Sequence, residues 1–191
     1  MFISTNPGTV NSPSTPDAIT GMDTVDKVPG EGEVSYDVRF TVFTPTKERI
    51  KLIINVEGQK KFNPGYDIVT RGIFYCARML SAQKDTEFTG SDYDSIKKVY
   101  SIWISMENPI YAQHTITSYQ LTAHPLYGLL PKHMRFDLME LVMICLGFQL
   151  DTKKGTPLHQ LLSTVLSDTL TPEEKIETMR KDYDIITTVE L

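Results

Sequence analysis

The chain has 191 residues, a net charge of -5, 40% hydrophobic residues and 23% charged residues. This length is enough for one domain with a buried core, and the composition excludes a disordered chain. The acidic balance also excludes a protein that binds nucleic acid through its overall charge, so any such binding must use a local basic patch.

Residues 1–30 are rich in Ser, Thr, Pro, Gly, Asn and Asp and show no hydrophobic periodicity. This predicts a flexible or irregular N-terminal segment, followed by one folded domain over residues 31–191. We find no signal peptide and no apolar run long enough to span a membrane. Cys76 and Cys145 lie in apolar runs and are expected to be buried free thiols, which favours a reducing, cytoplasmic compartment.

Period-two alternation predicts two strands, over residues 35–43 and 50–59, joined by a short polar loop that suits a hairpin. Their even-numbered side chains are apolar and are expected to face the core: Tyr36, Val38, Phe40, Val42, Ile50, Leu52, Ile54 and Val56. Asp37, Glu57 and Gln59 then share the opposite face of the pair.

If the hairpin is antiparallel and folds about Lys47, Asp37 lies opposite Glu57, with Cβ atoms about 4.5–5.5 Å apart. Two carboxylates this close repel, and one stays protonated unless a cation lies between them. Mg²⁺ would relieve the repulsion, since it binds one or two carboxylates together with water and phosphate. Gln59 could add an oxygen ligand or orient water. The alternative is a solvated polar face with an accidental register, and spacing alone favours neither.

A helix is predicted next, with Asn63 as its N-cap, Pro64 as its first residue and an end near Gln83. Its buried stripe is expected to contain Val69, Ile73, Cys76, Ala77 and Leu80. Asp67, Arg71, Tyr75 and Arg78 recur along another face. Guanidinium and phenol groups there are suited to holding a phosphate, although Asp67 and Arg71 could equally form a surface ion pair.

A strand over residues 96–105 follows this helix and completes a strand–helix–strand crossover, which predicts a mixed sheet with a helix on one face. Residues 115–123 alternate as a further strand. Residues 138–146 form a continuous apolar run, and the length of this run and Gly147 favour a strand over a buried helix. Two helices are predicted to begin at Thr156 and Thr171. The fold class is therefore α/β (α+β).

Several separated motifs resemble the PD-(D/E)XK nuclease superfamily, and more closely its branch of nuclease-family transposases and Rpn-like recombination-promoting nucleases. They lie at residues 31–40, 52–59, 62–66, 70–75, 96–103 and 173–183. The resemblance covers roughly residues 31–188 and implies a restriction-endonuclease-like mixed central sheet flanked by helices. Superfamily members usually carry a further acid on an N-terminal helix that residues 1–30 do not predict, and Gln59 stands where many members have lysine.

The resemblance implies hydrolysis of DNA phosphodiester bonds, dependent on Mg²⁺ or Mn²⁺ and related to transposition or recombination. Asp37 and Glu57 would hold the metal, and Gln59, Arg71 and Tyr75 would complete the catalytic site. The expected DNA contacts are Lys60, Lys61, Arg71 and Arg78. DNA is the expected partner, and a homodimer would be compatible with such a nuclease. The alternative is a catalytically inactive DNA-binding or interaction domain on a degenerate nuclease fold.

Overall fold

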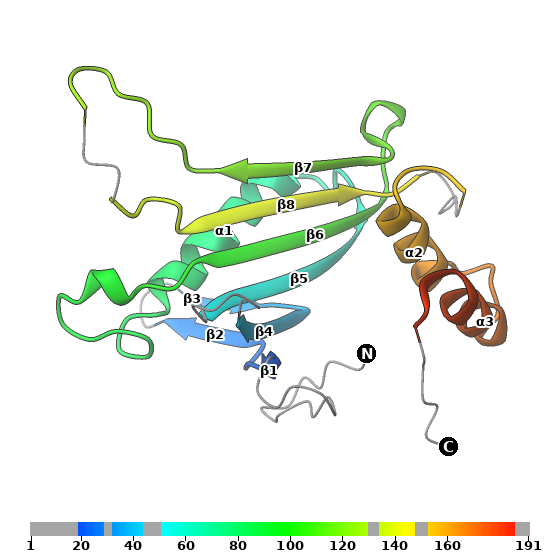
Figure 1. Cartoon of the computed structure of the whole chain (residues 1–191), viewed down its shortest axis with the longest axis horizontal. Helices are drawn as coiled ribbons and strands as arrows, with labels where there is room; N and C mark the ends of the chain where they lie inside the picture. The colour runs from blue at the N-terminus through cyan, green and yellow to red at the C-terminus, as the bar shows by residue number, and fades with distance from the viewer. Residues whose placement is uncertain (1–18, 29–31, 44–50, 130–133, 148–152, 186–191) are drawn as a thin grey trace.

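A six-stranded sheet forms the centre of the protein (Figure 1). The computed structural model describes residues 19–28, 32–43, 51–129, 134–147 and 153–185. The strands follow the spatial order β1-β4-β5-β6-β8-β7. Their bounds are β1 Ile19–Gly21, β4 Val38–Phe43, β5 Lys51–Lys61, β6 Val99–Glu107, β8 Met139–Cys145 and β7 Thr115–Gln120.

The sheet is mixed, as the sequence predicts. β5, β6 and β8 run parallel to one another, whereas β1 pairs antiparallel with β4, β4 with β5, and β7 with β8. Helix α1, Ile68–Ser81, connects β5 to β6 and lies behind β6 and β8 in Figure 1. The β4–β5 register pairs Val38 with Val56, which places the preceding Asp37 opposite Glu57 and confirms the predicted hairpin register.

A small antiparallel ribbon is formed by β2, Val25–Val28, and β3, Gly32–Ser35. Together with β1 it shows that the prediction of an irregular N-terminal segment is wrong for residues 19–28. β1 and β2 have only three and four residues, which is too short for a clear alternation of apolar and polar side chains. β1 forms its strand by pairing with β4, which lies later in the sequence. Residues 1–18 of the predicted segment lie outside the described part of the chain.

Helix α1 begins later than the sequence predicts. Its N-cap is Asp67, whose side chain accepts hydrogen bonds from the N–H groups of Val69 and Thr70 at 2.8 and 3.4 Å. Asn63 instead accepts a hydrogen bond from the N–H of Gly65 at 3.3 Å and closes a turn. Gly65 has a φ of +107°, which no helix accommodates, so the predicted start at Asn63 and Pro64 is wrong.

The core lies on the face of the sheet opposite to the predicted one. α1 packs on the odd-numbered face, which contains the fully buried side chains of Ile53, Val99, Trp103 and Leu141. The even-numbered apolar side chains of β4 and β5 are only half-buried. A parallel crossover has a fixed hand, so the strand order from β5 to β6 decides which face the helix covers. Alternation along β4 and β5 carries no such information.

The buried face of α1 is also rotated from the predicted stripe. Gly72, Tyr75, Cys76 and Met79 are buried, whereas Ala77 is exposed and Ile73 is 42% exposed. Gly72 allows the helix to approach closely, because a Cβ atom there would lie 2.6 Å from Leu141 Cδ1 and 3.1 Å from Trp103 Nε1.

The C-terminal part contains helices α2, Pro157–Leu166, and α3, Pro172–Tyr183, which lie beyond the end of β8 (Figure 1). Both start where predicted, with Thr156 and Thr171 in capping boxes. Strands β7 and β8 confirm the predicted strands over residues 115–123 and 138–146. Short 3₁₀ turns occupy Tyr93–Ser95 and Ile110–Ala112. Among the described helices, none has both the length and the apolar character needed to cross a membrane.

Candidate functional site

Asp37 and Glu57 meet where β4 begins beside β5. The N–H of Asp37 donates a hydrogen bond to Glu57 Oε1 at 3.2 Å, and the N–H of Gly58 donates to Asp37 Oδ2 at 2.8 Å. Each bond joins the backbone of one strand to a carboxylate of the other. The two carboxylates are therefore positioned by the strand register itself.

Glu57 is a buried carboxyl group, 5% exposed, whereas Asp37 is exposed. Burial and the negative charge of Asp37 raise the pKa of Glu57 from 4.5 to about 7. Hydrogen bonds from the Asp37 N–H and from Asn55 Nδ2, the latter at 3.0 Å, and the positive charge of Arg71 oppose this rise. Glu57 can therefore exchange a proton near neutral pH.

Arg71 on α1 is held beside this pair by aromatic residues. Its Nη1 donates to the Tyr66 hydroxyl at 2.6 Å, and its Nε and Nη2 donate to the Tyr75 hydroxyl at 3.2 and 2.5 Å. Its guanidinium carbon lies 5.4 Å from the ring centroid of Trp103, the register partner of Glu57 on β6. These bonds use three of the five N–H groups of the guanidinium, which leaves two that could bind an anion.

Tyr75 positions Arg71 and does not reach the solvent. It is 5% exposed, and its hydroxyl accepts from Arg71 and donates to the Ser35 carbonyl at 3.3 Å. Its ring packs edge-on against Tyr36 and Trp103, with centroids 5.2 and 5.4 Å away. Tyr75 therefore meets the candidate site through Arg71, to which its hydroxyl is hydrogen-bonded.

Gln59, Lys60 and Lys61 continue β5 beyond Glu57. Gln59 is half-buried on the same sheet face as Glu57 and is the register partner of Ser105. Lys60 and Lys61 are exposed, and Lys60 Nζ lies 3.8 Å from a carboxylate oxygen of Glu107. The structure thus brings these residues to the same end of the sheet as the carboxylate pair.

Arg78 does not belong to this group, and its expected DNA contact is wrong. It is 3% exposed, its Nη2 donates to the Gly32 carbonyl at 3.3 Å, and it lies 3.8 Å from Asp26 Oδ2. These contacts link α1 to the β2–β3 ribbon, so the guanidinium is directed toward Asp26 and away from solvent.

The carboxylate pair has donor atoms that fit a divalent cation. The two backbone hydrogen bonds use Glu57 Oε1 and Asp37 Oδ2, which leaves the second oxygen of each carboxylate outside these bonds. Mg²⁺ is commonly held by one or two carboxylates with water completing its shell. No group of three or more His, Cys, Asp or Glu residues that could hold a metal occurs within the described ranges.

Three residues of the site were missed by sequence reasoning: Asn55, Tyr66 and Trp103. A fully buried Asn55 two residues before Glu57 could have been suspected, because an amide inside an otherwise apolar strand usually serves a buried polar partner. Trp103 is the single tryptophan of the chain, but its place beside Glu57 depends on the parallel register. The Tyr66–Arg71 contact follows from the turn before α1 and has no local sequence signal.

Comparison with known proteins gave no further guide to the site. The chain matched no family model, no curated protein sequence and no solved structure.

Proposed function

We propose that this protein is a metal-dependent nuclease that hydrolyses phosphodiester bonds of DNA, in a reaction related to transposition or recombination. The observation that carries the proposal is the meeting of Asp37 and Glu57 across two neighbouring strands, with Arg71 beside them. Two opposed carboxylates favour a cation, and a fixed guanidinium favours a phosphate. A phosphodiester bound through Mg²⁺ or Mn²⁺ satisfies both.

Each residue has a role in this proposal. Asp37 and Glu57 would hold a divalent cation through their carboxylate oxygens, and the chemistry supplied by that cation would be compensation of phosphate charge and a lower pKa of a bound water molecule. Arg71 binds a non-bridging phosphate oxygen, with Tyr66 and Tyr75 fixing its orientation. The Gln59 amide orients the attacking water. Lys60 and Lys61 contact phosphates farther along the strand.

The proposal includes DNA as the partner and the cytoplasm as the compartment. Cys76 and Cys145 are free and buried, which supports a reducing environment. A homodimer, which would present two such sites to two strands, stays a prediction of the same proposal.

A second candidate function is a catalytically inactive DNA-binding or interaction domain. The observation that favours it is the internal bonding of the pair: Glu57 is buried and accepts from Asn55 and Asp37, while Asp37 accepts from Gly58. Such a pair can have a purely structural role, in which its hydrogen bonds hold β4 against β5. Gln59 also cannot take up a proton at neutral pH.

Nicking of supercoiled plasmid with Mg²⁺ or Mn²⁺ tests the two candidates. Asp37→Asn and Glu57→Gln should abolish metal-dependent nicking, because each keeps the size of the side chain and an acceptor oxygen while removing the charge. Glu177→Gln is the matched control, since this exposed residue on α3 forms an ion pair with Arg180 far along the chain. Circular dichroism establishes that each variant is folded. Absence of nicking by the wild type, or equal nicking by all variants, would favour the inactive domain.

A further inference from the structure

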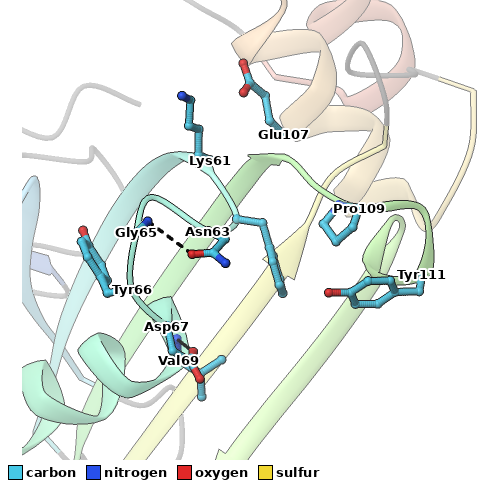
Figure 2. A pocket seen from close by; sticks show the side chains of 10 residues that line it. Lys61, Asn63, Gly65, Tyr66, Asp67, Val69, Glu107, Pro109 and Tyr111 are labelled. Carbon is cyan, nitrogen blue, oxygen red and sulfur yellow. Dashed lines mark hydrogen bonds between the residues drawn. The ribbon is translucent and has the colours of Figure 1, made fainter.

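A cavity of about 870 Å³ opens where β5 and β6 end, beside the turn that leads into α1 (Figure 2). Lys61 is the last residue of β5 and Glu107 is the last residue of β6. The side chains that matter for its chemistry are Lys61, Phe62, Asn63, Tyr66, Glu107 and Tyr111.

Tyr111 presents an open aromatic surface to this cavity. It is 81% exposed, and its ring meets Phe62 edge-on, with centroids 6.4 Å apart and an interplanar angle of 90°. The contact with Phe62 supports the ring from one side and leaves area for another flat group. Nucleobases stack on exposed aromatic rings of this kind without requiring a particular sequence.

Polar groups accompany the aromatic surface. The Asn63 side chain is oriented by the hydrogen bond that its oxygen accepts from Gly65, and Figure 2 shows it between Tyr66 and Tyr111. A side-chain amide offers the donor and acceptor pattern that matches the edge of a base. Lys61 stands at the rim, where an ammonium group can meet a backbone phosphate.

The cavity is connected to the proposed catalytic site through one side chain. Tyr66 lines the cavity, and its hydroxyl accepts the 2.6 Å hydrogen bond from Arg71. A strand whose phosphate lies at Arg71 would therefore bring a neighbouring nucleotide to the cavity.

Charge argues against binding that depends on duplex phosphates alone. The net charge is -5, and five basic residues outside the proposed site already form ion pairs with acidic side chains: Lys27, Lys51, Arg78, Lys98 and Arg180. Non-specific duplex binding relies on many unpaired cations. Base stacking is a source of affinity that such an acidic protein can use.

We propose that this cavity binds an unpaired nucleobase of single-stranded DNA, stacked on Tyr111 and hydrogen-bonded by Asn63, with Lys61 on the adjoining phosphate. The inference deepens the proposed nuclease function and rests on it, because Arg71 holds the phosphate beside the base. The substrate class is then DNA with unpaired nucleotides, including the transiently open regions of supercoiled plasmid.

Binding of fluorescently labelled 12-nucleotide DNA to the full chain in EDTA tests the proposal without any hydrolysis. The probes are a single strand, the blunt duplex of the same sequence, and a single strand with abasic sites that keeps the phosphates. The single strand should bind about tenfold or more tightly than either other probe, which is the scale of one stacked base. Tyr111→Ala should remove most of this preference and leave abasic binding unchanged.

Tyr127→Ala is the matched control, because Tyr127 is fully exposed and does not line the cavity. Four outcomes would each overturn the proposed base pocket. They are equal binding of the single strand and the abasic strand, equally tight binding of the duplex, no binding of any probe, and no effect of Tyr111→Ala. Metal-dependent nicking could still occur in any of these cases. Conversely, stacking that depends on Tyr111 in a chain that nicks nothing would support the base pocket while overturning the nuclease.

Discussion

The backbone N–H of Asp37 donates to the carboxylate of Glu57 at 3.2 Å, so the exposed acid helps to hold the buried one in place. The returning bond from Gly58 to Asp37 makes the arrangement reciprocal. A pair fixed by two strands of a sheet is well suited to hold a ligand with little reorganisation. The close approach of the two carboxylates disfavours the state in which both are charged. This effect on the stability of the protein can be measured.

The stability of the metal-free protein should fall as the pH rises through the titration of Glu57. Its pKa is about 7 in the folded state against 4.5 as a model value, so its neutral form is favoured by folding. This contribution is complete below pH 4.5 and is lost as the pH passes 7. The shift corresponds to about 3 kcal/mol at pH 8.

Glu57→Gln should therefore be more stable than the wild type at pH 8 in EDTA, by up to about that amount, and similar near pH 4.5. Glutamine keeps an acceptor for Asn55 and for the Asp37 N–H. Urea denaturation at the two pH values measures the difference. Equal stabilities at pH 8 would show that the charged form of Glu57 does not destabilise the folded protein.

Asn55→Ala should raise the pKa of Glu57 further. Asn55 is fully buried and donates to Glu57 Oε1 at 3.0 Å, and a hydrogen bond to a carboxylate favours its charged form. The variant should also lose about 1–3 kcal/mol of stability, because a buried acceptor loses its donor. NMR titration of the Glu57 carboxyl carbon measures the shift. An unchanged or lower pKa would mean that water replaces the amide.

Gly72→Ala should destabilise the protein by up to about 2 kcal/mol, because overpacking costs about 1–3 kcal/mol and the better helix propensity of alanine offsets about 1 kcal/mol. The new methyl group would lie 2.6 Å from Leu141 Cδ1. Thr70→Ala on the exposed face of the same helix is the control and should be neutral or slightly stabilising. Denaturation followed by Trp103 fluorescence compares them. A stabilised Gly72→Ala would show that α1 packs less closely.

Arg71→Lys should lower nicking strongly while leaving the fold intact. A lysine carries the same charge but lacks the planar group that binds the hydroxyls of both Tyr66 and Tyr75. Weaker substrate binding should appear as a higher KM, with no change in the metal concentration needed for half-maximal activity. Lys97→Arg, on a half-buried residue before β6, is the reverse exchange used as the control. Full activity of Arg71→Lys would remove Arg71 from the site.

The hairpin register could be predicted because β4 and β5 both alternate and are joined by a short loop, which fixes Asp37 opposite Glu57. The face on which α1 packs could not be predicted from these strands. It depends on the hand of the β5–α1–β6 connection. The polar side chains of Asn55 and Glu57 concealed it, since each is buried with hydrogen-bond partners.

The same limit explains the error at Arg78. Local spacing places Arg71 and Arg78 on one side of a helix, but only the tertiary fold shows that Asp26 of β2 meets Arg78. Asp26 belongs to a four-residue strand within a segment without periodicity. The position of Asp67 as N-cap was concealed in a similar way, because Asn63 and Pro64 offer an equally good helix start. Only the left-handed conformation of Gly65 excludes that start.

The two buried cysteines provide a reporter of motion within the sheet. Cys76 on α1 is fully buried, and burial raises the pKa of its thiol to about 11, while burial also raises the pKa of the Cys145 thiol at the end of β8. A thiol reagent therefore reacts with either residue only during an opening event. The labelling rate of Cys145→Ser, which keeps Cys76, would measure how often α1 lifts from the sheet. The labelling rate of Cys76→Ser, which keeps Cys145, would measure how often the end of β8 frays.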